Sequence, residues 1–185
     1  MTQIINLFGG PGCGKSTVAS GIFHEMKKSH MSCELISEFA KDIVWEEANK
    51  LLGNQIFIFA EQFRRQFRLI NKVNYVVTDS PLLLNSIYYN HYTLKNTEPF
   101  FSNDFNVLLC KVFDRTFLEF ENINIMLERE YDYEPEGRVQ TAEEAKEIDR
   151  LIFNKLKLEY NQNVEIWRLS EASERTKKLV ERLKE

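Results

Sequence analysis

The feature that most constrains the fold of this chain is a glycine-rich segment near its beginning, GGPGCGKS at residues 9–16. It fits the pattern G-x-x-x-x-G-K-[ST]. It lies between an apolar run at 4–8, which predicts a buried strand, and residues 16–28, which have helical spacing. Glycines there let successive backbone amides point at one oxyanion, and the helix adds its positive N-terminal end. The segment therefore predicts a strand, a phosphate-binding loop and a helix in succession.

The polar residues of this segment have separate expected roles toward ATP and Mg²⁺. Lys15 is expected to reach the β and γ phosphates, Ser16 to coordinate magnesium through its hydroxyl, and Thr17 to contact the α phosphate. The alternative is a chance glycine-rich turn, which ordinary residue frequencies give in under about 1% of chains of this length. The residues predicted to bind the nucleotide are Gly9, Gly10, Pro11, Gly12, Cys13, Gly14, Lys15, Ser16 and Thr17.

Strand-like and helix-like segments alternate along the rest of the chain. Further strands are predicted at 33–37, 75–78, 123–127 and 164–169, and further helices at 39–51, 56–70, 82–89, 105–117, 141–160 and 171–185. Thr141 and Glu144 have the spacing of a capping box at the start of one of these helices. The alternation predicts an α/β fold with a mainly parallel five-stranded sheet covered on both faces, in a single domain at 1–185.

Two carboxylates follow predicted strands and are expected near the phosphate loop. Asp79 comes directly after the strand at 75–78, at the sheet edge where the loop also lies, and is the candidate that holds magnesium together with Ser16. Glu38 follows the second strand in the same way and is the candidate that activates an attacking hydroxyl. The alternative for both is an ordinary cap at a helix start, which for Asp79 precedes Pro81.

A polar segment rich in Tyr, Glu, Gly and Pro follows the fourth strand and predicts a lid at about 129–140. Arg129 and Arg138 flank it, and phosphoryl transfer requires cations near the charge that develops on the transferred group. The two arginines are therefore candidate catalytic residues, and the alternative is that both are solvated surface residues.

The charge balance favours a small ligand over a large polyanion. The chain has 24 Lys plus Arg against 28 Asp plus Glu, a formal net charge of −4 and a pI of about 5.6, whereas nonspecific nucleic-acid binders are usually basic. A local basic cluster remains at Arg64, Arg65 and Arg68. Helical spacing predicts that one of the three faces the site and that the others face solvent or pair with Glu61.

Cysteine usage and hydropathy indicate a cytoplasmic protein. Cys13, Cys33 and Cys110 lie far apart without zinc-ligand spacing, so reduced thiols are expected. The first residues show no secretion signal, and no apolar run approaches the roughly 20 residues that span a bilayer. No membrane association is expected, and the oligomeric state stays open.

Four segments together resemble the small P-loop kinases and AAA-like ATPases. They are GGPGCGKST, SEFAKD after the second strand, VVTDSPLL after the third, and LEREYDYEPEGRVQTAEEAKEID. The nearest pattern is that of nicotinamide riboside kinase domains and of nucleoside and nucleotide kinases encoded by bacteriophages. The resemblance implies a P-loop NTPase three-layer sandwich, with the phosphate-loop strand beside the Asp79 strand. It also implies a substrate cleft near Glu38 and a lid from Arg129 to Arg138.

The function expected from these features is ATP- and magnesium-dependent phosphoryl transfer to a nucleoside- or nucleotide-like small molecule. One alternative is a kinase that acts on a modified, hydroxymethylated base in DNA, which the acidic net charge disfavours. Another is a regulatory module that binds or hydrolyses nucleotide without an acceptor. Residues 71–74 lack the aspartate of N-K-x-D and residues 79–82 lack the glycine of D-x-x-G, which argues against a guanine-nucleotide switch.

Overall fold

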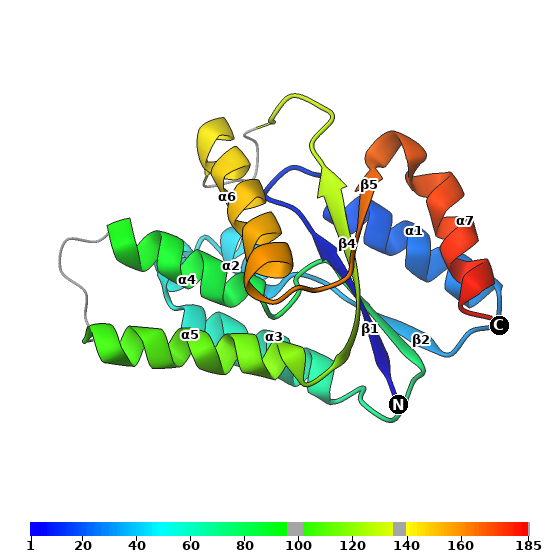
Figure 1. Ribbon diagram of the computed structural model, residues 1–185, viewed down its shortest axis with the longest axis horizontal. Coiled ribbons are helices and arrows are strands. Elements are labelled where there is room, and N and C mark those ends of the chain that lie inside the picture. Colours follow the sequence, from blue (N-terminus) through cyan, green and yellow to red (C-terminus); the bar gives the residue numbers. More distant parts are fainter. Residues whose placement is uncertain (96–101, 135–139, 185) are drawn as a thin grey trace.

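The computed structural model describes residues 1–95, 102–134 and 140–184, and in them a five-stranded parallel sheet forms the centre of the molecule (Figure 1). Its strands are β1 (Gln3–Phe8), β2 (Cys33–Ile36), β3 (Tyr75–Thr78), β4 (Glu121–Glu128) and β5 (Val164–Arg168). Their order is β2-β3-β1-β4-β5, so β1 is central and lies between β3 and β4. The predicted α/β class and parallel sheet are confirmed, and so is the pairing of the first strand with the third.

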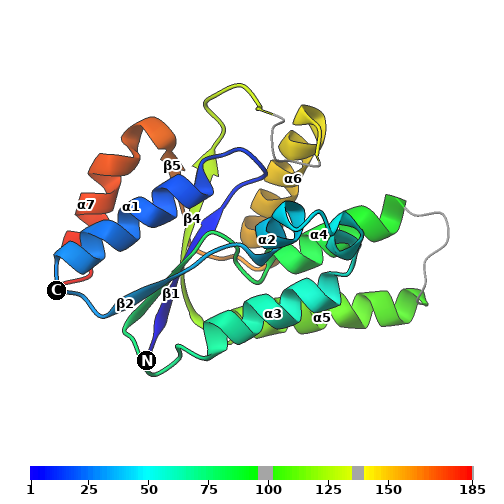
Figure 2. The ribbon, with the colours of Figure 1, turned by 180° about the vertical axis from the view of Figure 1, so that it is seen from behind.

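Helices form a layer on each face of the sheet, as Figures 1 and 2 show from opposite sides. One layer consists of α1 (Lys15–Lys28) and α7 (Ala172–Arg182). The other consists of α2 (Phe39–Trp45), α3 (Gln55–Phe67), α4 (Leu84–Lys95), α5 (Asn103–Leu118) and α6 (Ala142–Asn154). Three short segments complete the path, the 3-10 helices η1 (Asn49–Gly53) and η3 (Leu169–Glu171) and the π-helical turn η2 (Lys155–Glu159).

The side-chain alternation of β1 divides the core between the two layers. Ile5 and Leu7 are fully buried in the cluster that includes residues of α1 and α7. Ile4 and Phe8 point to the opposite face, and Phe8 packs edge-on against Phe117 of α5 at 6.0 Å between ring centroids. Because both faces are covered, every residue of the strand after Gln3 is buried, as expected for a central parallel strand.

The two largest errors in helix length are predictions that extend six residues beyond the observed α-helix. The helix predicted at 39–51 ends at Trp45, because Glu47 has a positive φ of 56° that the right-handed helix does not allow, and η1 follows. The helix predicted to reach Tyr160 is α-helical only to Asn154 and continues as the π turn η2. In that wider turn Lys155 and Tyr160 both reach the buried carboxylate of Asp114, at 2.9 and 2.6 Å.

Candidate active site

The phosphate-loop sequence leaves β1 at the edge where β2 and β3 also end. Gly14 has a φ of +83°, which only glycine adopts freely, and Gly10 lies so close to α6 that a Cβ there would be 2.6 Å from the carbonyl oxygen of Ala145. The loop is therefore restricted to glycine at these two positions by backbone conformation and by packing.

Lys15 is the first residue of α1, and its ammonium group lies over the loop. Its Nζ donates hydrogen bonds to the carbonyl oxygens of Gly9 at 2.8 Å and Gly10 at 3.1 Å. The residue also lines the cavity that begins at the loop. A cation is thus held where the pattern predicts that phosphate oxygens bind.

Ser16 and Asp79 meet at the carboxyl end of β3. Ser16 Oγ donates a hydrogen bond of 2.5 Å to Asp79 Oδ2, and Asp79 is 4% exposed. The other carboxylate oxygen, Oδ1, is buried without a hydrogen-bond partner among the described residues, an arrangement that is costly unless a ligand satisfies it. A hydroxyl and a carboxylate are the hard oxygen donors that Mg²⁺ prefers.

These two side chains fit a magnesium ion that takes its remaining ligands from phosphates and water. Within the described ranges, no group of three His, Cys, Asp or Glu residues could hold a metal alone. Magnesium bound with nucleotides commonly uses only one or two protein oxygens, so Ser16 and Asp79 suffice on the protein side.

Glu38 begins α2, and its carboxylate makes no capping hydrogen bond there. The side chain is half-buried and lines the same cavity as Lys15 and Ser16. Burial raises the pKa of the Glu38 carboxyl, the charge of Lys15 lowers it, and the charge of Asp79 raises it further, with a net upward shift. The structure therefore brings Glu38, Lys15, Ser16 and Asp79 to one place, as the strand-end argument predicted.

The cavity has a volume of about 420 Å³ and extends from the loop over α2, η1, α3 and α4. Gln55 and Asn85 line it, are 6% and 3% exposed, and donate their amide hydrogens to the carbonyl oxygens of Leu52 and Leu82. Neither residue can be singled out from the sequence, because each has the pattern of an ordinary polar residue of a helix. The other lining residues beyond Glu38 are Ala40, Lys41, Val44, Trp45, Leu52, Ile58, Ser80, Leu84, Tyr88 and Gln140.

Arg129 lies against the phosphate loop but is not among the residues that line the cavity. Its Nε and Nη2 are 3.1 and 3.0 Å from Asp149 Oδ2, while Asp149 Oδ1 accepts the Gly10 backbone N–H. Asp149, which no sequence signal indicated, therefore joins α6, the loop and Arg129. Arg138 lies outside the described residues, together with the rest of 135–139 in the segment predicted as a lid.

Cys13 is a second loop residue that lies beside this ion pair. Burial raises the pKa of its thiol to about 11, and the charge of Asp149 acts in the same direction. The thiol is therefore protonated at neutral pH, and its sulfur lies 3.4 Å from Asp149 Oδ1.

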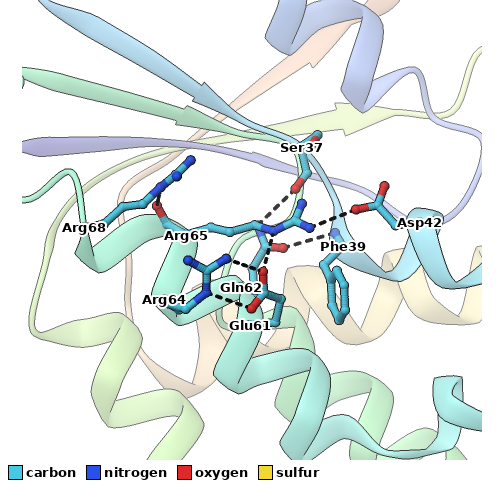
Figure 3. Close-up of polar contacts among 8 residues, drawn as sticks. All are labelled: Ser37, Phe39, Asp42, Glu61, Gln62, Arg64, Arg65 and Arg68. Carbon is cyan, nitrogen blue, oxygen red and sulfur yellow. Dashed lines mark hydrogen bonds and ion pairs between the residues drawn. The ribbon is translucent and has the colours of Figure 1, made fainter.

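The basic cluster, Arg64 and Arg65 in α3 and Arg68 directly after it, does not line the cavity. Arg64 pairs with Glu61, and Arg68 Nε donates to the carbonyl oxygen of Arg65 (Figure 3). Only Arg65 reaches α2, where it binds Asp42 at 2.8 Å. The predicted pairing with Glu61 is present. The prediction that one of the three arginines faces the site is wrong, because Arg65 contacts the neighbouring helix α2 instead.

A glycine loop between strand and helix, with Lys15, Ser16 and Asp79 gathered at the edge of this parallel sheet, defines a P-loop nucleotide-binding protein. The family model described as AAA domain matches residues 4–175, and the chain belongs to that family.

Two solved structures share the fold. A NadR protein in complex with NR matches with a TM-score of 0.64 and 14% identity over 89% of this chain. The deoxyadenosine kinase from M. mycoides with bound dCTP matches with a TM-score of 0.58 and 16% identity, over 97% of this chain and 99% of the kinase. This chain spans 45% of the NadR protein. No curated protein matches the sequence.

These likenesses confirm the resemblance to small P-loop kinases at the level of the fold.

Across the described ranges, no helix is both long and apolar enough to cross a membrane.

Proposed function

We propose that this protein is a kinase that uses ATP and Mg²⁺ to phosphorylate a hydroxyl group of a nucleoside-like small molecule. The observation that carries the proposal is the position of Glu38, which shares one cavity with the P-loop residues Lys15 and Ser16. The Glu38 carboxylate makes no capping bond, so it is available to accept the proton that an attacking hydroxyl loses.

The residues that meet at this edge of the sheet have separate roles in the proposed transfer. Lys15 neutralises charge on the β and γ phosphates, and Glu38 accepts the proton of the attacking hydroxyl. Ser16 and Asp79 would hold magnesium, which would supply positive charge against the negative charge of the phosphates. The backbone of the loop orients the transferred group and restrains its movement.

In this proposal, Arg129 and Arg138 are the cations near the transferred phosphoryl group. The ion pair with Asp149 already holds Arg129 against the loop, and its buried Nη1 has no hydrogen-bond partner among the described residues. A guanidinium held in this way can add charge stabilisation without first losing side-chain entropy.

The cavity wall supports a hydroxyl acceptor more than a phosphate acceptor. Of the described residues that line it, only Lys15 and Lys41 are basic, and Lys15 belongs to the ATP side. A monophosphate acceptor normally requires several cations, preferably arginines that bind it in bidentate fashion. Apolar side chains with a few amides instead suit a flat, uncharged ring.

The test is ATP consumption with a panel of nucleosides, nucleoside monophosphates, nicotinamide riboside and DNA that carries hydroxymethylated bases. We expect a phosphorylated nucleoside-like product, identified by mass spectrometry. Transfer only to DNA, with steep salt dependence, would establish the DNA kinase instead. ADP formation without any phosphorylated product would leave a nucleotide-hydrolysing module.

A further inference from the structure

The backbone around Glu38 is held by a side chain from another helix. Gln62, in the middle of α3 and 2% exposed, accepts a hydrogen bond from the Phe39 backbone N–H at 3.2 Å. Its Nε2 donates a longer bond, 3.5 Å, to the carbonyl oxygen of Ser37. One amide group thus contacts the backbone on both sides of Glu38 (Figure 3).

The contact with Gln62 supplies a hydrogen-bond acceptor at the start of α2. The first backbone N–H groups of a helix have no partner within the helix, and a capping side chain commonly satisfies one of them. Glu38 occupies the cap position of α2 without bonding back to the helix. Because Gln62 supplies the acceptor for Phe39, the Glu38 carboxylate remains available to the cavity that it lines.

Arg65 ties the same two helices together one turn further along α3. It binds Asp42 of α2 at 2.8 Å and Glu61 of its own helix at 3.1 Å. Its guanidinium also lies over the ring of Phe39, 4.9 Å from the ring centre. The residue that follows Glu38 is therefore fixed through its backbone by Gln62 and through its ring by Arg65.

From this geometry we infer that Gln62 is a positioning residue, which sets the direction of the Glu38 carboxylate toward the acceptor hydroxyl. The inference rests on the proposed function, in which Glu38 accepts the proton. Gln62 itself is absent from the cavity lining, so it acts only through the backbone at 37–39. The amide of Gln62 carries both the acceptor that the Phe39 N–H requires and the donor that the Ser37 carbonyl requires.

The test compares Gln62→Met with Gln66→Met, a matched control. Gln66 lies one turn further along the same helix and is also 2% exposed. The probes are ATP with water as acceptor and ATP with the acceptor found in the nucleoside panel. We expect kcat of Gln62→Met to fall about 10- to 100-fold with the KM for ATP unchanged, because small misplacements of a catalytic group have effects of this size. Gln66→Met should keep the wild-type kcat.

A double-mutant cycle separates positioning from general structural damage. In the Glu38→Gln background, Gln62→Met should cause no further loss, because the group that it positions is already disabled. An equal loss in both backgrounds, or a kcat for Gln62→Met equal to that of Gln66→Met, overturns the inference. If Glu38→Gln alone keeps full kcat, the proposed role of Glu38 fails instead, and the two failures are thereby distinguished.

A second variant covers the case in which Gln62→Met does not fold, and a second measurement on Gln62→Met covers the case in which it folds but no acceptor substrate has been found. Gln62→Glu keeps the acceptor for the Phe39 N–H and enters the same cycle with Glu38→Gln. Hydrogen exchange of the Phe39 amide, which needs no acceptor substrate, should accelerate in Gln62→Met and stay slow in Gln66→Met. Unchanged exchange in Gln62→Met would show that the bond does not hold this backbone.

Discussion

The two walls of the cavity are built in different ways. The donor wall is one continuous loop, residues 11–17, with Asp79 buried behind it. Lys15 bonds to the loop backbone and Ser16 to Asp79. The acceptor wall is assembled from α2, η1, α3 and α4, with amides anchored on backbone carbonyls and Trp45 73% exposed. We expect the donor wall to determine whether transfer occurs and the acceptor wall to determine what is phosphorylated.

The largest effect should come from the donor wall, with Lys15→Ala. The side chain supports no core contact and bonds only the loop carbonyls, so its loss should abolish detectable transfer, about 10³-fold or more, and leave the fold intact. Coupled ADP release and circular dichroism measure the two effects. Lys72→Ala, at an exposed lysine, is the control, and unchanged turnover in Lys15→Ala would remove the main claim.

Glu38→Gln tests the proposed general base, a carboxylate that lines the acceptor wall. Loss of a general base should lower kcat by about 10²- to 10⁴-fold. Because burial raises the pKa of Glu38, wild-type kcat should rise with pH through a value above the usual range of glutamate, as the active carboxylate form appears. A pH–rate profile measures this limb, and its survival in Glu38→Gln would assign the titration to another group.

Asp79→Asn separates metal binding from nucleotide binding within the donor wall. The amide can keep the contact with Ser16 but loses the charge that a magnesium ion needs, so turnover should fall about 10²-fold. Nucleotide affinity measured without metal should change less than about twofold. Equal losses in turnover and in metal-free binding would make Asp79 a structural residue.

The smallest effect should come from Gln55→Leu in the acceptor wall. We expect KM for the acceptor to rise several-fold, while kcat and the KM for ATP stay near wild type, because uniform binding contributes to KM alone. A steady-state matrix over both substrates gives the three values. If KM for ATP rose equally, the cavity would not divide into a donor and an acceptor wall.

The same division explains what could be predicted from the sequence. The donor wall follows from a contiguous motif and from the rule that parallel strands end at one edge. The sequence therefore predicts that Lys15, Ser16 and Asp79 lie at the same sheet edge, and the structure has them there. Gln62 could not be found in this way. Its partner Phe39 is 23 residues away, and only the packing of α3 on α2 brings them together.

The contact of Asp149 with the phosphate loop could not be predicted for a related reason. It lies within a helix whose start the capping box of Thr141 and Glu144 predicted well. Its contact with Gly10 depends on how closely α6 approaches the loop, and periodicity does not contain that distance. The early end of α2 was also not predicted. Glu47 adopts a left-handed φ there, and no Gly or Asn at that position indicates it.

The central place of β1 has a consequence for how the chain acquires its activity during synthesis. This strand is made first, yet both of its neighbours come late, β3 at 75–78 and β4 at 121–128. Such distant parallel pairings close long loops and fold slowly. The phosphate loop leaves this strand directly, so a growing polypeptide should gain affinity for nucleotide only after β4 has been synthesised and has paired with β1.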